Sequence, residues 1–257
     1  MSRIFITGSS DGLGKMAARL LLADGHRVVL HARNKERAAQ AAAALPDAED
    51  VLVGDLASLA QTRALASKAN DLGTFDAVIH NAAVGYKEPR CLVTEDGLPH
   101  VFAVNSLAPY VLTALMHRPK RLVYISSRLH LNGNPSLRDL HWNSRLWDGT
   151  QAYSDSKLHN VLLAFAMARL WPATHANALE PGWVATKMGG PEAPDDLELA
   201  PKTQVWLASS DAPEATGSGN YFYHQKPSRV HERAHDVELQ MQFLAECARL
   251  SKTALPI

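Results

Sequence analysis

A tyrosine and a lysine four positions apart are the first residues whose types and spacing suggest chemistry. Tyr153 and Lys157 lie in the stretch "QAYSDSKLHN", which opens a long amphipathic pattern, so both side chains fall on one face of a helix. A phenol with an ordinary pKa of about 10 exchanges protons poorly at neutral pH unless a nearby ammonium stabilises its phenolate. The pair could therefore act as a general acid/base. The same spacing also occurs on purely structural helices, so the hypothesis depends on the residues around it.

A serine at the end of an apolar run gives this pair a possible companion. Ser127 closes "YISS" and lies 26 positions before Tyr153. A hydroxyl there could donate a hydrogen bond to a substrate oxygen and hold it near the tyrosine, where charge develops during the reaction.

Three glycines crowd one turn near the N-terminus, in "ITGSSDGLGKM". The turn follows a short apolar run and precedes an apolar helical pattern. Glycine permits positive φ and close approach to the backbone, while the N-terminus of the next helix offers free N–H groups and the positive end of the helix dipole. This order predicts a binding site for the pyrophosphate of a dinucleotide. The expected contacts are Gly8, Ser10, Asp11, Gly12, Leu13 and Gly14.

The next apolar run ends in "VVLHARN" and lacks the carboxylate that holds the ribose hydroxyls of NAD. Arg33 lies at that end instead. A guanidinium suits a ribose 2′-phosphate through paired, charge-assisted hydrogen bonds, so we predict NADP(H) in preference to NAD(H). A solvated arginine at the end of a strand is the alternative.

Two further strand ends carry residues suited to the same ligand. Asp55 and Leu56 end one run, where the carboxylate could accept a hydrogen bond from the adenine amino group. Asn81, Ala82 and Ala83 end the next, where small side chains leave room for a ribose. Because Asp and Asn also end ordinary strands, each motif alone is weak.

Short apolar runs alternate with helical patterns along the chain. The runs are too short for helices and are mostly rich in β-branched residues, which predicts buried strands. The alternation favours an α/β fold: a Rossmann-type, doubly wound parallel sheet in a three-layer α/β/α single domain, residues 1–257. Ligands of such sheets bind beyond the carboxyl ends of the strands. The predicted strands are 4–6, 28–30, 51–53, 77–79, 122–125 and 175–179, and the predicted helices are 16–23, 38–45, 59–69 and 156–171.

Composition excludes several other classes of protein. Lys plus Arg and Asp plus Glu number 26 each, so there is no overall field for nucleic acid or an anionic membrane. Cys91 and Cys247 lack the spacing of metal ligands or of a disulfide framework, and the histidines lack ligand pairing, so we expect reduced thiols and no metal. We find no signal peptide and no run long enough to span a membrane, and therefore expect a cytoplasmic protein.

Taken together and in order, these motifs resemble the short-chain dehydrogenase/reductase family over almost the whole length of the chain. The longer spacing between the serine and the tyrosine, together with the closing segment, resembles the retinol dehydrogenase-like branch and its bacterial relatives. The residues that carry the resemblance are Thr7-Gly8-x-x-x-Gly12-x-Gly14, Asp55-Leu56, Asn81-Ala82-Ala83, Asn105, Ser126-Ser127, Tyr153-x-x-x-Lys157 and Pro181-Gly182-Trp183-Val184-x-Thr186.

The resemblance implies a catalytic tetrad. Tyr153 would be the general acid/base, and Lys157 would bind the nicotinamide ribose and lower the tyrosine pKa. Ser127 would orient the carbonyl, with Ser126 its structural neighbour, and Asn105 would hold a water that links Lys157 to solvent.

The family also implies contacts near the nicotinamide and three variable segments. The additional cofactor contacts are Pro181, Gly182, Val184 and Thr186. Specificity would come from an insert at 128–151, a substrate loop at about 187–200 and a C-terminal tail at about 224–257. Trp142 and Trp147 of the insert could line a substrate pocket or form a small core of their own, and 161–171 could be core or subunit contact.

The resulting hypothesis is an NADP(H)-dependent oxidoreductase that moves a hydride between nicotinamide and a carbonyl or alcohol of a small molecule, with a bulky apolar substrate suggested by the branch. The alternative is a non-catalytic NADP-binding sensor on the same fold. The helix after Asn105 looks short. Because that helix forms subunit contacts in the family, this leaves the oligomeric state open, with a homodimer as one expectation.

Overall fold

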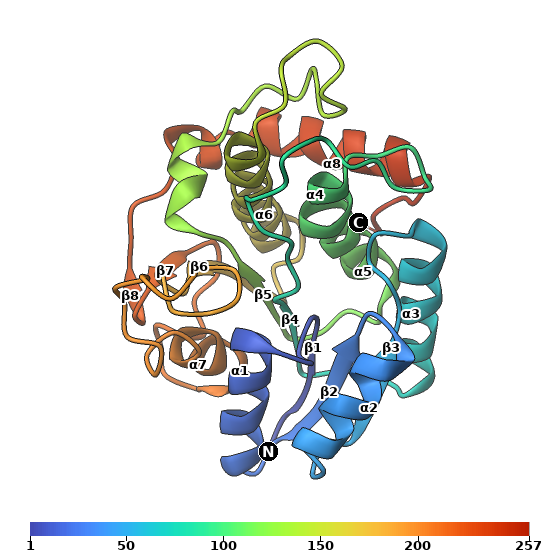
Figure 1. Cartoon of the computed structure of the whole chain (residues 1–257). Coiled ribbons are helices and arrows are strands. Elements are labelled where there is room, and N and C mark those ends of the chain that lie inside the picture. The colour runs from blue at the N-terminus through green and yellow to red at the C-terminus, as the bar shows by residue number, and fades with distance from the viewer. Residues whose placement is uncertain (257) are drawn as a thin grey trace.

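The structure, a computed structural model, describes residues 1–256 of the chain. One eight-stranded sheet forms the centre of this part (Figure 1). Its order is β3-β2-β1-β4-β5-β6-β7-β8, with every pair parallel except β7 and β8. The order reverses between β1 and β4, where such sheets bind ligands. The strands are β1 Arg3–Ile6, β2 Arg27–Ala32, β3 Asp50–Val53, β4 Ala77–His80, β5 Arg121–Ile125, β6 His175–Glu180, β7 Tyr221–Tyr223 and β8 Lys226–Pro227.

Helices cover both faces of this sheet, as the three-layer prediction requires (Figure 1). Helices α1, α2 and α7 pack on one face, and α3, α5 and α6 pack on the other, with α8 lying outside α5 and α6. Each predicted strand and helix is present, within about four residues of its expected ends except at the start of α6, which begins seven residues before the predicted 156. The helices are α1 Gly12–Ala23, α2 Lys35–Ala44, α3 Leu59–Asp71, α4 His100–Phe102, α5 Ala108–Leu115, α6 Gly149–Leu170, α7 Lys202–Ser209 and α8 Val237–Ser251, and the short turns are η1 Ala103–Leu107, η2 Arg128–Asn132 and η3 Glu232–His235.

The inner strands are mainly apolar because both faces of the sheet are buried. Along β1, Phe5 packs with the α3, α5 and α6 layer, whereas Ile4 and Ile6 pack with the α1, α2 and α7 layer. Successive side chains of a strand point to opposite faces, so a parallel sheet between two helical layers favours apolar residues at most positions of a strand. This explains why the short apolar runs predict the strands well.

Polar side chains fix where the helices begin. Asp11, Asn34 and Asp148 precede α1, α2 and α6, and each accepts a hydrogen bond from a backbone N–H of the first turn. Capping of this kind satisfies a donor that has no partner within the helix. Helix α6 thereby begins at Gly149, so the last residues of the predicted insert at 128–151 belong to this helix and Tyr153 lies in its second turn.

The helical run after β4 contains a π-helical turn. It begins with α4 at His100, passes through η1 and ends with α5 at Leu115. Asn105 lies in the π turn and is fully buried. The sequence predicts a short helix after Asn105. The helical run begins five residues before Asn105, so it is longer than the segment that follows this asparagine. A π turn inside a helix often marks a functional position.

The insert folds into a small unit of its own. The rings of Trp142 and Trp147 pack edge to face at 4.9 Å, and the Arg145 guanidinium lies 3.6 Å from the Trp142 ring centroid. Arg145 also pairs with the buried Asp155 of α6 at 2.9 Å, and Asp155 accepts a hydrogen bond from the Asn134 backbone at 2.7 Å. The two tryptophans therefore form the core of the insert.

The apolar stripe at 161–171 is interior to the chain. Leu162 and Ala166 are fully buried, and α8 packs along α6 with Phe243 and Cys247 also fully buried. This stripe is therefore core. Among residues 1–256, no helix combines the length and apolar character needed to cross a membrane.

Gly14 should not tolerate a side chain. A Cβ there would lie 2.4 Å from Asn81 Nδ2 and 2.6 Å from the Gly8 carbonyl oxygen. We expect Gly14→Ala to lower the free energy of unfolding by about 2–3 kcal/mol, because the turn or β4 must shift. Urea denaturation followed by circular dichroism would measure this.

Gly12→Ala is the matched control in the same turn. Its φ is +54°, but no atom lies within 4 Å of a Cβ there, so only the cost of the left-handed backbone, about 1 kcal/mol, should be seen. An unchanged stability of Gly14→Ala would contradict the close packing of the turn against Asn81.

Candidate active site

Tyr153 and Lys157 lie one turn apart on α6, beside the carboxyl end of β5. The Lys157 Nζ donates a 3.0 Å hydrogen bond to the Ile125 carbonyl and lies 5.2 Å from the centroid of the Tyr153 ring. Both side chains are buried. The predicted pair therefore shares one face of the helix, and the last residue of β5 holds the ammonium.

Burial shifts the pKa of both groups. It lowers the pKa of Lys157 to about 7. It also raises the pKa of Tyr153 well above its ordinary range, and Tyr86 adds to that rise, while a hydrogen bond with Ser127 opposes it. Charged forms are disfavoured away from water. The Tyr153 phenol thus holds its proton at neutral pH, and its pKa is raised where the sequence predicts that Lys157 lowers it, because burial is the largest effect.

The two serines at the end of β5 have different surroundings. The Ser126 hydroxyl is buried and donates a 2.8 Å hydrogen bond to the Lys157 carbonyl, which ties β5 to α6. Ser127 is half-buried, and its Oγ accepts a weak hydrogen bond from the Leu129 N–H at 3.3 Å. Ser127 is thus the serine whose hydroxyl is left to interact with Tyr153, and its role in orienting a substrate remains a prediction.

Asn105 uses its side chain to join two segments. Its Nδ2 donates to the Val84 carbonyl and to Ser156 Oγ, both at 3.0 Å, and its Oδ1 accepts from the Val84 N–H at 2.8 Å. Both amide hydrogens are therefore used within the protein. This asparagine fastens the loop after β4 to α6, and a water linked to Lys157 would have to bind elsewhere on Asn105.

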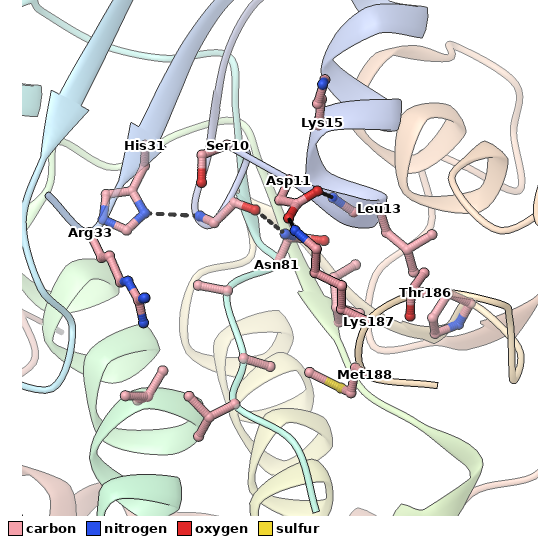
Figure 2. Close-up of a pocket in the computed structure, with 18 of the residues that line it drawn as sticks. Ser10, Asp11, Leu13, Lys15, His31, Arg33, Asn81, Thr186, Lys187 and Met188 are labelled. Carbon is pink, nitrogen blue, oxygen red and sulfur yellow. Dashed lines mark hydrogen bonds and ion pairs between the residues drawn. The ribbon is translucent and has the colours of Figure 1, made fainter. Parts of the chain in front are cut away.

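The glycine turn and Tyr153 both line a cavity of about 660 Å³. Figure 2 shows its lining around the glycine turn. The cavity opens beyond the carboxyl ends of the central strands, as expected for a doubly wound sheet. Most residues predicted to bind the cofactor line it. They are Gly8, Ser10, Asp11, Gly12, Leu13, Arg33, Asp55, Leu56, Asn81, Ala82, Ala83, Tyr153, Lys157, Pro181 and Thr186.

Five predicted residues are not among those that line this cavity: Gly14, Asn105, Ser127, Gly182 and Val184. Gly14 packs against Asn81, and a Cβ at Gly182 would approach within 2.8 Å of a carboxylate oxygen of Asp195. Val184 is buried. The roles of these five residues remain predictions.

Four cations that line the cavity were missed from the sequence. They are Lys15, Arg19, Arg37 and Lys187. Lys15 and Arg19 are four apart on α1, a spacing that places them on one helix face and could have revealed them. Lys187 could not have been found in this way, because it reaches Asp11 across 176 positions of sequence (Figure 2).

His31 was also missed as part of the site. Its Nδ1 accepts a 2.9 Å hydrogen bond from the Gly8 N–H, and its Nε2 lies 2.8 Å from the Gly54 carbonyl (Figure 2). These partners require a neutral ring with its hydrogen on Nε2. Burial lowers the His31 pKa, which keeps the ring neutral. His31 therefore holds the glycine turn to the ends of β2 and β3.

The loop after Thr186 lies across the cavity. Lys187 forms an ion pair with Asp11 of the glycine turn, and the Met188 sulfur lies 3.8 Å from the Tyr153 hydroxyl. The Lys187 hydrogen bond is the largest effect on Asp11 and lowers its pKa. The predicted substrate loop thus contacts both the glycine turn and the tyrosine.

A nucleotide cradle beside a buried Tyr–Lys pair defines a nicotinamide-dependent dehydrogenase or reductase on a Rossmann-type sheet. A family model described as short chain dehydrogenase matches residues 2–138. The chain is 46% identical over 260 residues to an uncharacterized oxidoreductase of Emericella nidulans, covering 100% of this chain and 99% of the relative. It belongs to the short-chain dehydrogenase/reductase family.

Two further comparisons agree with this assignment. Human retinol dehydrogenase 13 is 31% identical, over 96% of this chain and 83% of the relative, as expected for the retinol dehydrogenase-like branch. The crystal structure of an uncharacterized protein from Mycobacterium paratuberculosis superposes with a TM-score of 0.82 at 28% identity, covering 100% of this chain and 96% of that one. The family and the fold predicted from the sequence are confirmed.

Lys157 should make stability depend on pH. Its pKa is about 7 in the folded protein against an ordinary 10.5, so between these values the unfolded chain binds a proton that the folded chain lacks. Stability then rises with pH. We expect the free energy of unfolding to increase by on the order of 1–2 kcal/mol between about pH 7 and pH 9.

Urea denaturation at several pH values measures this increase. Lys157→Met should abolish it, whereas Lys226→Met, at an exposed position of β8, should retain it. Identical pH profiles for wild type and Lys157→Met would show that Lys157 is not the responsible group.

Proposed function

We propose that the protein is an NADP(H)-dependent oxidoreductase that reduces the carbonyl group of a small, mainly apolar molecule. The observation that carries the proposal is the position of Tyr153 and Lys157 in a cavity that several cations also line. At Gly12, which lines the cavity, no protein atom lies within 4 Å of an added Cβ, so the main chain there is open to the close approach that a dinucleotide needs. When bound, the nicotinamide supplies or accepts the hydride.

Each residue of the tetrad has a separate part in this proposal. Tyr153 donates its proton to the carbonyl oxygen of the substrate while the carbon is reduced. Ser127 donates a hydrogen bond to the same oxygen and so orients the carbonyl. Lys157, which lines the cavity, would bind the nicotinamide ribose and assist the return of a proton to Tyr153. Asn105 holds the loop after β4 in place beside them.

The preference for NADP(H) follows from charge. Arg33 lies at the end of β2, and Lys15, Arg19 and Arg37 line the same cavity. Asp11 pairs with Lys187 and lies 3.5 Å from Arg37, which leaves Arg33, Lys15 and Arg19 for an anionic group. A ribose 2′-phosphate supplies that group, whereas the ribose of NAD does not.

The apolar substrate and the reductive direction rest on the surroundings of Tyr153. Met188 and the ring of Tyr86, whose centroid lies 5.6 Å from that of Tyr153, surround the hydroxyl with apolar surface. The likeness to retinol dehydrogenase 13 supports a bulky apolar substrate. A protonated Tyr153 supports reduction. A non-catalytic sensor would need neither the buried Lys157 nor this arrangement around the phenol.

Tyr153→Phe should retain NADPH binding and lose catalysis. The variant lacks the proton donor, so we expect kcat to fall by at least about 100-fold with little change in the Kd for NADPH. Fluorescence titration measures binding, and the absorbance of reduced nicotinamide with a panel of aldehydes and ketones measures turnover. Tyr86→Phe removes a neighbouring hydroxyl and should retain most activity. Near-normal turnover by Tyr153→Phe would disprove the assignment.

Arg33→Ala should weaken the binding of NADPH much more than the binding of NADH. Loss of charge-assisted hydrogen bonds to a 2′-phosphate should raise the Kd for NADPH by about 10-fold or more and leave the Kd for NADH nearly unchanged. Arg249→Ala, which removes an exposed arginine of α8, controls for a general change of charge. Equal effects of Arg33→Ala on both cofactors would contradict the proposed phosphate contact.

A further inference from the structure

A buried histidine lies directly behind the catalytic serine. His130 belongs to η2, the short 3-10 helix that begins after Ser127, and its side chain is fully buried. The His130 Nδ1 lies 2.7 Å from the Ser127 carbonyl oxygen, and its Nε2 accepts a 3.2 Å hydrogen bond from the His231 N–H. The ring therefore joins the segment of the serine to the C-terminal tail.

These two partners fix the state of the ring. Because Nε2 accepts a hydrogen bond, the hydrogen must lie on Nδ1, which donates it to the Ser127 carbonyl. The ring also packs against Tyr221 of β7, with centroids 4.5 Å apart. Burial lowers the His130 pKa to about 4, so the ring stays neutral over the ordinary working range of pH. Its donor and its acceptor therefore keep these directions.

Apart from its hydrogen bond with Tyr153, the Ser127 hydroxyl has little else to hold it. Its side chain accepts a 3.3 Å hydrogen bond from Leu129 N–H, close to the limit for such bonds. Its carbonyl, in contrast, accepts both the His130 N–H at 2.9 Å and the His130 ring. The position of the hydroxyl thus depends on the main chain of Ser127, which His130 holds from behind.

The turn that carries His130 is itself pressed against α6. A Cβ at Gly133, which follows η2, would lie 2.7 Å from Leu158 Cβ and 2.9 Å from the Ser154 carbonyl oxygen. Ser154 and Leu158 flank the catalytic residues along α6. A change at His130 would therefore alter the relation of Ser127 to Tyr153.

We propose that His130 is a positioning residue for Ser127: its Nδ1–H fixes the Ser127 carbonyl, and the tail N–H of His231 selects the tautomer that makes this possible. This inference rests on the proposed function, in which Ser127 orients the substrate carbonyl. His130 lies outside the lining of the cofactor cavity. Its loss should therefore lower kcat and leave the KM for NADPH unchanged.

Two amide substitutions test the two hydrogen bonds of the His130 ring separately. In His130→Asn the amide nitrogen can replace Nδ1 and donate to the Ser127 carbonyl, while the bond to His231 is lost. In His130→Gln the amide oxygen can replace Nε2 and accept from His231, while the bond to Ser127 is lost. We expect kcat within about 3-fold of wild type for Asn and a loss on the order of 10–100-fold for Gln.

The experiment compares wild type, both His130 variants, Ser127→Ala and Ser127→Ala/His130→Gln. NADPH oxidation is followed with aromatic aldehydes and diketones, beginning with benzaldehyde. Thermal melting and NADPH titration establish that each variant is folded. The proposal expects the double variant to be no slower than Ser127→Ala, because both changes act on the same hydroxyl.

Three results would overturn the proposal, and they differ in what else they affect. A slow Ser127→Ala with a normal His130→Gln would refute the role of His130 alone. A normal Ser127→Ala would refute the role of Ser127 in the proposed function, and the inference with it. An activity of His130→Asn that is as low as that of His130→Gln, with both variants folded, would show that the hydrogen bond to the Ser127 carbonyl does not by itself account for the role of His130.

Discussion

Direct contact between two backbone segments is the constraint on which this site depends. At Gly8 and Gly14 the turn between β1 and α1 meets the end of β4 so closely that a Cβ would lie within 3 Å of Ala82 and Asn81. Asn81 Nδ2 donates to the carbonyls of Thr7 and Gly8, and His31 holds the Gly8 N–H from the other side. The floor of the cavity is therefore rigid and made largely of main chain, which an anionic ligand can approach.

The catalytic end of the cavity is built from the hydrophobic core. Lys157 and Asn160 both donate to the Ile125 carbonyl, and Ser126 donates to the carbonyl of Lys157. These bonds connect the carboxyl end of β5 to the middle of α6, so the position of the Lys157 ammonium is set by the packing of a strand against a helix. Its depressed pKa follows from the same burial. The hydrogen bonds that join β5 to α6 therefore both stabilise the fold and set the position and pKa of Lys157.

The sequence predicts the parts of the fold that depend on local pattern. Apolar runs buried on both faces predict the strands, and spacing predicts the shared face of Tyr153 and Lys157. It does not predict His31, whose two ring nitrogens bind Gly8 and Gly54, because each bond joins residues 23 positions apart. The π turn at Asn105 and the pairing of Lys187 with Asp11 were missed for the same reason: they follow from how distant segments pack. The sequence does not decide between a pocket and a core for Trp142 and Trp147, because aromatic residues with this spacing can serve in either.

The C-terminal helix affects which helix faces of this chain can contact another subunit. Tyr110 of α5 donates to the Thr253 carbonyl, Trp171 donates to that of Pro256, and α8 lies along α6 (Figure 1). The outer faces of α5 and α6 are thus occupied by the chain's own last residues. An assembly of subunits through these faces would first have to displace α8, and a chain shortened before α8 would expose apolar surface and tend to aggregate.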